Sequence, residues 1–413
     1  MADHTSRSGF GRFRVLRDFG RLPPVLQLLV GTQLCFNVGF YMVLPYLATH
    51  LAQDLALAGG LVGLVLGLRT FSQQGLFVIG GTLSDRLGAK PVILAGCALR
   101  VGGFVLLGVA GDLAGVIAGA LLTGFAAALF SPAVESSIAR ETAEHAEVPR
   151  AEAFAMFAVS GQVGSVIGPL AGAGLLLVDF RLACLVAAGA FVLIGLAHLA
   201  WLPRRPAAHA DEPMLAGWAE VLANRRFLAF AAGYSGYLLC YNQLYLALPA
   251  ELDRTTGNQG ALGLLFVLAS VMVIGGQLPV TRWARRRGTG GIVLGFVLMA
   301  CAFGVVAFTV VVPFGPALWP AVAFVVLLTA GQMVAVPLAQ DLVPRLAGER
   351  RLGAYFGLLS SAGGLTVLIG STAAGSLLDP AVAPPVVAWL VLGAVPLGSA
   401  LVIGRLARRG TLS

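Results

Sequence analysis

The stretch Gly80-Gly-Thr-Leu-Ser-Asp-Arg-Leu-Gly-Ala-Lys-Pro-Val-Ile-Leu94 is a short polar segment between two long apolar runs. A connection this short joins helices that lie antiparallel and adjacent. Pro91 suits the first turn of the second helix. Gly81 and Gly88 of this segment permit close backbone approach or a positive φ. Three charges lie within six positions: Asp85, Arg86 and Lys90.

The composition is that of a membrane protein. The 413 residues are 58% apolar and 11% charged, whereas soluble domains carry roughly 25% charged residues. Apolar runs of about 20 residues, the length that spans a bilayer, recur along the whole chain. The sequence therefore predicts an all-α membrane protein with twelve transmembrane helices. The predicted spans are 23–50, 59–83, 91–111, 114–133, 152–176, 181–202, 227–249, 259–281, 290–312, 317–340, 353–377 and 385–406.

Basic residues are distributed unevenly between the two sets of loops. The net charge is +8, and if both termini lie on one side, all but four of the 27 Lys and Arg residues fall on that side. Arg181 and Arg254 lie in the opposite loops, and Arg69 and Arg100 lie within spans. This positive-inside bias predicts a multi-pass protein of the cytoplasmic membrane with both termini in the cytoplasm. It also argues against nucleic-acid binding.

The two halves of the chain share short motifs in the same order. Val78-Ile-Gly-Gly-Thr-Leu83 in the second span matches Val273-Ile-Gly-Gly-Gln-Leu278 in the eighth. The aromatic–Asn dipeptides at 36–37 and 241–242 form a second pair. Six helices are therefore expected to occur twice. The predicted organisation is a cytoplasmic arm 1–22, a six-helix half 23–202, a cytoplasmic linker 203–226, a second half 227–406 and a tail 407–413.

Two arginines lie deep within predicted spans. Arg69 and Arg100 are each about ten residues from a span end, which is roughly 15 Å and near the midplane of a ~30 Å hydrocarbon core. A charge at this depth has to face protein or water. Gln73 follows Arg69 by one helical turn, so Arg69 is a candidate cavity charge, with a structural anchor as the alternative. Arg100 is expected to be structural, paired with a carboxylate or with carbonyl groups.

Four tyrosines of the seventh span are spaced by 3, 4 and 4 positions and share one helical face. Tyrosine hydroxyls in a membrane need partners, so the face lines a wet cavity or forms a hydrogen-bonded packing seam. We predict a cavity between the halves, with polar and aromatic residues of the first span as counterparts. The predicted substrate-binding residues are Gln33, Asn37, Phe40, Tyr41, Arg69, Gln73, Tyr234, Tyr237, Tyr241, Asn242, Tyr245 and Gln332.

The polar stretch quoted first resembles the loop signature of the major facilitator superfamily, Gly-x-Leu-Ala-Asp-Arg-x-Gly-Arg-Lys. Ser84 and Ala89 depart from it, and six positions match: Gly81, Leu83, Asp85, Arg86, Gly88 and Lys90. The resemblance implies two six-helix halves around a midplane site and transport by alternating access. It also implies that the loop helps to latch one conformational state. A charged turn without a mechanical role is the alternative.

The fifth span resembles a second signature, the Gly-x-x-x-Gly-Pro-x-x-Gly motif of drug:proton antiporters in this superfamily. Gly164, Gly168, Pro169 and Gly172 match it. By resemblance, the motif seals the cavity between the halves and favours exchange over leak. Tight helix packing through small residues also explains the glycines.

The first half is most similar to the MdtH-like multidrug exporters, in segments 67–75, 80–91 and 179–182. The resemblance implies export of small amphipathic compounds driven by inward proton flow. The first span carries amides where many such exporters have a carboxylate. The remaining candidates for proton coupling are Asp85, Glu135 and His198. Because Arg69 has no deep acid beside it in the sequence, we expect neutral, zwitterionic or anionic substrates.

Two rival interpretations belong to other functional classes. A proton-coupled importer or facilitator of a small metabolite would use the same fold. An intramembrane enzyme would need convergent nucleophile, base or metal ligands, whereas the five histidines are scattered and the five cysteines lack metal or redox spacing. We therefore expect no enzymatic activity, no metal and no cofactor. The expected partners are a small-molecule substrate, protons and the lipid bilayer, and the protein is expected to be a monomer.

Overall fold

The computed structural model of the protein describes residues 19–145, 148, 150–205, 218–348 and 352–412. Within these ranges the regular secondary structure is entirely helical. Ten helices there are long and apolar enough to cross a membrane. The prediction of an all-α membrane protein is confirmed.

The helices follow the predicted spans closely. The first half contains α2 (Pro24–Thr49), its π-helical continuation η1 (His50–Asp54), α3 (Gly59–Gly75), α4 (Phe77–Leu87), α5 (Ala89–Val109), α6 (Leu113–Glu144), α7 (Arg150–Leu175) and α8 (Phe180–Trp201). A short helix, α9 (Trp218–Ala223), lies in the predicted linker. The second half contains α10 (Arg225–Tyr234), α11 (Gly236–Asn242), α12 (Ala247–Thr256), α13 (Leu262–Arg285), α14 (Thr289–Val311), α15 (Trp319–Leu346), α16 (Leu352–Leu378) and α17 (Pro385–Arg408).

Two of the twelve predicted spans are broken helices, which corrects the expectation of continuous ones. The predicted span 59–83 is divided into α3 and α4 at Leu76. Gly75, a weak helix former, precedes the break, and its carbonyl oxygen accepts a hydrogen bond of 3.2 Å from the Ser361 hydroxyl of α16. A side chain from the other half therefore takes part at the point where the helix is interrupted.

The predicted span 227–249 is divided into α10, α11 and α12. Pro249 lacks an amide hydrogen and its ring would clash with the carbonyl of Tyr245 four residues earlier, so the turn before it unwinds. Residues 243–245 are held by tighter bonds to the third residue back, as in the 3.0 Å bond from the Tyr245 amide to the Asn242 carbonyl. These two broken runs and the ten continuous helices together account for the twelve spans.

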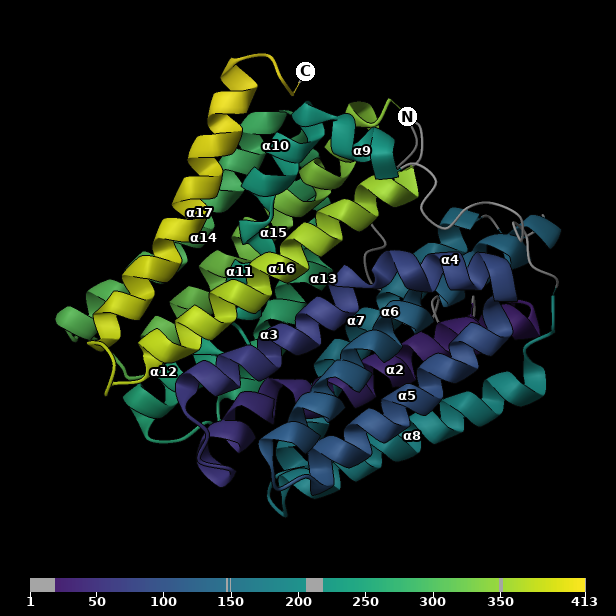
Figure 1. Ribbon diagram of the computed structural model, residues 1–413, viewed down its shortest axis with the longest axis horizontal. Coiled ribbons are helices and arrows are strands. Elements are labelled where there is room, and N and C mark those ends of the chain that lie inside the picture. Colours follow the sequence, from purple (N-terminus) through teal and green to yellow (C-terminus); the bar gives the residue numbers. More distant parts are fainter. Residues whose placement is uncertain (1–18, 146–147, 149, 206–217, 349–351, 413) are drawn as a thin grey trace, which may run out of the picture.

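The halves lie side by side, with α3 and α16 next to each other along the seam (Figure 1). Glycines allow this approach: a Cβ on Gly63 would overlap the carbonyl oxygen of Ser371, and one on Gly67 would lie 2.9 Å from the Cα of Leu368. A second seam joins α7 to α13, where the hydroxyls of Ser165 and Ser270 lie 3.0 Å apart. Small residues thus let the two halves touch at backbone distance.

The two ends of the bundle differ in charge. One end carries Gly88, α9 and the last turn of α17, and most of the described basic loop residues lie there (Figure 1). We call it the basic end. The opposite end carries η1, the start of α3 and α12.

The close packing of α3 on α16 leads to a first prediction. Gly63→Ala should lower the melting temperature of the purified protein, because overpacking of a tight contact costs about 1–3 kcal/mol. The matched control is Gly102→Ala on α5, where an added Cβ meets nothing within 4 Å. This control should be neutral or slightly stabilising, since Ala favours a helix over Gly by roughly 0.5–1 kcal/mol. Equal melting temperatures for the two variants would contradict the described seam.

Candidate functional site

A cavity of about 350 Å³ lies beside the seam, toward the basic end. It is bounded by α10, α11, α15 and α16 of the second half and by Gln74 of α3. Its polar and aromatic lining includes Gln74, Tyr234, Tyr237, Tyr241, Gln332 and Gln340. Four of the predicted substrate-binding residues therefore line one chamber: Tyr234, Tyr237, Tyr241 and Gln332.

The tyrosines of the seventh span form a continuous row across the broken helix. The ring centroids of Tyr234 and Tyr237 are 5.4 Å apart, those of Tyr237 and Tyr241 are 6.4 Å apart, and those of Tyr241 and Tyr245 are 5.9 Å apart. Tyr234 ends α10 and Tyr237 lies in α11, so their stacked rings continue the row across the first break. Tyr245, at the far end of the row, does not line the chamber and packs on Phe266 of α13 at 5.2 Å.

Arg69 lies where that row meets the first half. Its guanidinium donates a 2.6 Å hydrogen bond to the Gln73 Oε1 and stacks 4.6 Å from the ring centroid of Phe40. It lies within electrostatic range of the Tyr41, Tyr241 and Tyr245 side chains. The structure thus brings together one cluster next to the chamber, which we call the arginine–tyrosine centre: Phe40, Tyr41, Arg69, Gln73, Tyr241 and Tyr245.

Arg100 has a different environment, inside the first half. One Nη donates a 2.5 Å hydrogen bond to the Thr123 carbonyl. Four phenylalanine rings surround its guanidinium at 4.5 to 5.7 Å: Phe36, Phe40, Phe104 and Phe191. The expected structural role and carbonyl partner agree with this geometry. Within the described part of the chain, neither Arg69 nor Arg100 forms an ion pair with a carboxylate.

Asn242 occupies a buried junction between the halves. Its Oδ1 accepts a 3.2 Å hydrogen bond from Thr70 of α3, and its Nδ2 donates a 3.0 Å hydrogen bond to Ser371 of α16. The next residue, Gln243, is fully buried, and its Oε1 is enclosed without a hydrogen-bond partner among the described residues. Asn242 is therefore a link between three central helices in this conformation, and its side chain does not line the chamber.

Gln33 and Asn37 lie on the face of α2 that packs against α7. The Asn37 Nδ2 donates a 2.9 Å hydrogen bond to the Gln33 carbonyl. A Cβ on Gly164 would lie 2.7 Å from the Cβ of Asn37, and one on Gly168 would lie 2.6 Å from the Cβ of Tyr41. The glycines of the fifth span thus pack on α2 within the first half.

Contact between the fifth span and the second half is made by its other residues. Besides Ser165, these include Pro169, which lies close to Gly263 of α13. The carbonyl oxygen of Pro169 also accepts a 2.6 Å hydrogen bond from Tyr46 of α2, within the first half. A Cβ on Gly263 of α13 would lie 2.8 Å from the Tyr46 hydroxyl and 3.3 Å from the Pro169 oxygen. The gating role of Gly164, Gly168, Pro169 and Gly172 stays a prediction.

The loop between α4 and α5 anchors the start of the linker. Gly88 has a φ of 84°, which glycine adopts without strain, and an added Cβ would lie 2.9 Å from the Arg205 carbonyl. The Lys90 ammonium donates hydrogen bonds of 2.8 and 2.6 Å to the carbonyls of Leu199 and Leu202, at the C-terminal end of α8. A cation at this position also complements the helix dipole. The side chains of Gly81 and Asp85 lie outside the described residues.

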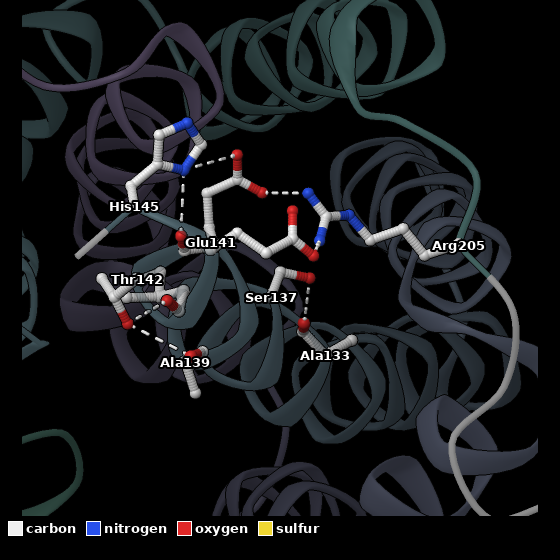
Figure 2. A network of polar contacts seen from close by, with 9 residues as sticks. Ala133, Ser137, Ala139, Glu141, Thr142, His145 and Arg205 are labelled. Atoms are coloured by element: carbon white, nitrogen blue, oxygen red, sulfur yellow. Dashed lines mark hydrogen bonds and ion pairs between the residues drawn. The ribbon is translucent and has the colours of Figure 1, made fainter.

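A polar network extends this anchor to the end of α6 (Figure 2). The Arg205 guanidinium spans two carboxylates, donating a 2.6 Å bond to Glu141 and a second bond to Glu144. Nδ1 of His145 lies 3.6 Å from a carboxylate oxygen of Glu141. α6 continues eleven residues beyond the predicted span end at 133, and this extension carries Glu141 and Glu144, with His145 as its C-cap. The network therefore fixes the start of the linker to the first half.

The opposite end holds a larger cavity of about 650 Å³ between the halves. Two hydrogen bonds cross it: the Thr49 hydroxyl donates to Gln259, and the Gln53 amide donates to Asp253 at 3.3 Å. Glu251 is buried on its wall and accepts two hydrogen bonds from Arg254, at 2.6 and 2.8 Å. Burial raises the pKa of the Glu251 carboxyl, and the bonds from Arg254 oppose this shift. One hydrogen bond between neutral side chains and one to a carboxylate thus join the halves at this end.

Two of the three candidates for proton coupling, His198 and Glu135, have described side chains, and their surroundings differ. His198 is fully buried in the first half, where its Nδ1 lies 2.8 Å from the Ile194 carbonyl and its Nε2 is enclosed without a described partner. Glu135 is exposed on α6. The Asp85 side chain lies outside the described residues, so no contact of its carboxylate is described.

Sequence reasoning did not select several residues that shape the site. Gln74, Ser360 and Gly363 line the chamber, and Thr70 and Ser371 hold Asn242. Gln74 is adjacent to a selected residue, which is a usable signal. The others are small residues in apolar runs. The sequence does not mark them as site residues, and only the contact between α3 and α16 shows that they shape the site.

This architecture, two six-helix halves around a central polar and aromatic chamber, defines the class of secondary membrane transporters. The profile of the Major Facilitator Superfamily matches residues 29–371. An uncharacterised MFS-type transporter of Mycobacterium tuberculosis is 41% identical over 383 residues, covering 90% of this chain and 89% of the relative. Multidrug resistance protein MdtH of Aeromonas hydrophila is 31% identical over 373 residues, covering 89% of this chain and 91% of the relative.

Solved structures show the same fold at low sequence identity. The peptide transporter POT in complex with sulfate matches with a TM-score of 0.78 and 16% identity, over 94% of this chain and 95% of the transporter. The nucleoside transporter NupG matches with a TM-score of 0.75 and 15% identity, over 92% and 98%. The chain belongs to the Major Facilitator Superfamily, as its loop signature predicts, and it is a multi-pass membrane transporter of small molecules, not an enzyme.

The contacts of Lys90 lead to a second prediction. Lys90→Met should lower the melting temperature by about 2–5 °C, because it removes two charge-assisted hydrogen bonds to the end of α8. Lys90→Arg is the matched control and should retain most of the stability, because its guanidinium can donate to the same carbonyls. Thermal unfolding of the purified proteins measures both. A Met variant as stable as the wild type would show that the contact contributes nothing.

Proposed function

We propose that this protein exports small amphipathic, drug-like compounds from the cell in exchange for protons, by alternating access. The observation that carries this proposal is the tyrosine-lined chamber beside the seam, in a chain 31% identical to a multidrug resistance protein. Aromatic walls with few polar groups suit compounds that vary in shape. The antiporter-like sequence of the fifth span, Gly164 to Gly172, supports the direction of transport.

The proposed orientation places the basic end and both termini in the cytoplasm. The asymmetry of Lys and Arg supports it, because basic loops stay on the cytoplasmic side. In this orientation the chamber lies toward the cytoplasm and the hydrogen bonds of Thr49 and Gln53 close the outer side. Such a conformation would load substrate from inside the cell. The protein acts as a monomer in this proposal, with the substrate site between its own two halves.

Residue roles follow from this proposal. The substrate contacts the chamber tyrosines and Gln332 and reaches the arginine–tyrosine centre. The polar loop that holds Gly81, Asp85, Arg86, Gly88 and Lys90 latches one end state. Asp85, Glu135 and His198 remain the candidates for carrying the proton. Because Arg69 is the central charge, neutral, zwitterionic or anionic compounds are favoured over lipophilic cations.

An importer or facilitator of a small metabolite is the second candidate. The observation that favours it is the charge of the centre: among the described residues that surround Arg69, none is a carboxylate that could carry a proton. A transporter without a proton-carrying acid at its centre can move substrate down its own gradient.

Accumulation of labelled compounds distinguishes the two candidates. Cells that express the protein should accumulate less of a neutral or anionic drug-like compound than control cells. A protonophore should abolish the difference, because it removes the driving force of proton exchange. Raised accumulation in expressing cells would overturn export and establish the importer. Reduced accumulation that the protonophore leaves unchanged would overturn proton coupling.

The latch has a separate test. Asp85→Asn should leave the melting temperature within about 2 °C of the wild type, since it replaces a carboxylate with an amide of nearly the same size and shape. It should nevertheless reduce transport about tenfold or more, because one conformational state loses an ionic contact worth on the order of 1.4 kcal/mol. Initial rates of efflux from preloaded cells measure this effect. Normal flux in the folded variant would refute the latch.

A further inference from the structure

Arg69 carries a charge for which the described structure offers no anion. It is 6% exposed, yet its one hydrogen bond is to the neutral Gln73 and its other close contact is the face of Phe40. A buried charge without a counter-charge is costly at this depth. None of its nitrogens is among the fully enclosed polar atoms without a partner, whereas Nε and one Nη of Arg100 are. The Arg69 guanidinium therefore still borders open space.

Three tyrosine hydroxyls gather at the same place from both halves. The hydroxyls of Tyr241 and Tyr245 lie 3.3 Å apart, and the hydroxyl of Tyr41 interacts with both. Tyr41 belongs to α2 of the first half, and the other two belong to the seventh span of the second. A phenol hydroxyl can donate to an anion. Arg69 and the three hydroxyls are thus a set of donors that both halves contribute.

A second cation adds to the positive potential of this centre. The Arg100 guanidinium lies 5.5 Å from the Phe40 ring, and the Arg69 guanidinium lies 4.6 Å from the same ring. Two guanidinium groups therefore share one aromatic side chain, and the two charges interact. Since like charges in a low-dielectric interior repel, an anion at Arg69 would be favoured by both.

We propose that the arginine–tyrosine centre is a binding site for the carboxylate of an organic anion. Arg69 supplies a planar fork of donors, which matches the geometry of a carboxylate, and Gln73 holds that fork in position. The hydroxyls of Tyr41, Tyr241 and Tyr245 bond to the remaining oxygen lone pairs. The apolar body of the ligand occupies the chamber, because Tyr241 both lines the chamber and belongs to the centre.

The geometry also argues against other ligands at this site. A cation would meet two guanidinium groups without a carboxylate to offset them. A neutral amide would accept from Arg69 but would leave the charge uncompensated. Because a carboxylate is drawn to donors from both halves, it would favour the conformation in which Tyr41 and Tyr241 lie together. Substrate binding and closure of the centre would thereby be coupled.

The test is equilibrium binding to the purified full-length protein in detergent, without a membrane gradient. The probes are naphthoate, naphthamide and naphthylmethylamine, which share one apolar body and differ in charge. Naphthoate should bind at least about tenfold more tightly than naphthamide, because a charge-assisted hydrogen bond usually contributes about this factor to binding. Unspecific partitioning would favour the neutral amide, so it cannot produce this order.

Variants test whether the preference for naphthoate over naphthamide arises at the arginine–tyrosine centre. Arg69→Gln should abolish the difference between naphthoate and naphthamide, and Arg69→Lys should retain part of it, because it keeps the charge but loses the fork. Tyr241→Phe should weaken naphthoate binding several-fold while leaving the fold intact. The matched control is Arg181→Gln, which removes one positive charge from an exposed position at the start of α8. It should bind naphthoate like the wild type.

Some results would overturn the proposal. Equal binding of naphthoate and naphthamide, tighter binding of the amine, or a carboxylate preference that survives in Arg69→Gln would each do so. Tyr241→Phe keeps the test decisive if Arg69→Gln does not fold. The inference rests on the proposed function in treating the centre as part of a transport site. Because binding is measured without flux, failure of export in cells would leave this result standing, and failure of carboxylate binding would leave export standing.

Discussion

Inside a bilayer a charged group has no water to solvate it, and this constraint governs the centre of the bundle. The protein meets it in two ways. Arg100 is enclosed by four phenylalanine rings and one carbonyl, so its charge is spread over aromatic faces within a single half. Arg69 is placed at the boundary between the halves, among groups that both halves contribute. The surroundings of Arg100 hold its charge within one half, whereas the position of Arg69 is suited to a ligand.

The same constraint explains why the helices break where they do. A broken helix exposes backbone groups that need partners, and in a membrane other helices have to supply them. Ser361 bonds to the Gly75 carbonyl at the break between α3 and α4. At the break after Asn242, the tighter turns at residues 243–245 satisfy the backbone and the Asn242 amide links Thr70 to Ser371. Both breaks therefore lie where side chains of the two halves meet.

The sequence predicted the parts of the structure that depend on local pattern. The length of the apolar runs predicted the spans, because the bilayer thickness sets the length of a spanning helix. The 3, 4, 4 spacing predicted the tyrosine row, because a shared helical face depends only on the helical period. The breaks at Leu76 and after Asn242 depend on contacts between halves, which a single span does not reveal. Pro249 was a local signal for the second break. Likewise, Gln33 and Asn37 have the composition of cavity residues, but the glycines of α7 bring that face of α2 into a packed interface. The contact of Lys90 with α8 joins residues more than a hundred positions apart, so no spacing rule could predict it.

The loop after the second helix makes different contacts in the two halves, and this difference bears on how the protein moves. In the first half, Gly88 and Lys90 fix the start of the linker and Arg205 fixes it to Glu141 and Glu144. In the second half, the corresponding loop has no acid, and Arg287 stacks 3.7 Å from the ring of Trp283. At the other end of the linker, the Asn224 amide donates a 2.9 Å bond to the Leu346 carbonyl of α15. The linker is thus bound to both halves at the basic end, which limits how far that end can open. At the opposite end, two described hydrogen bonds join the halves directly, Thr49 to Gln259 and Gln53 to Asp253, and both have to break when that end opens. Because the contact between α3 and α16 is lined by glycines, the bundle is suited to rock about it.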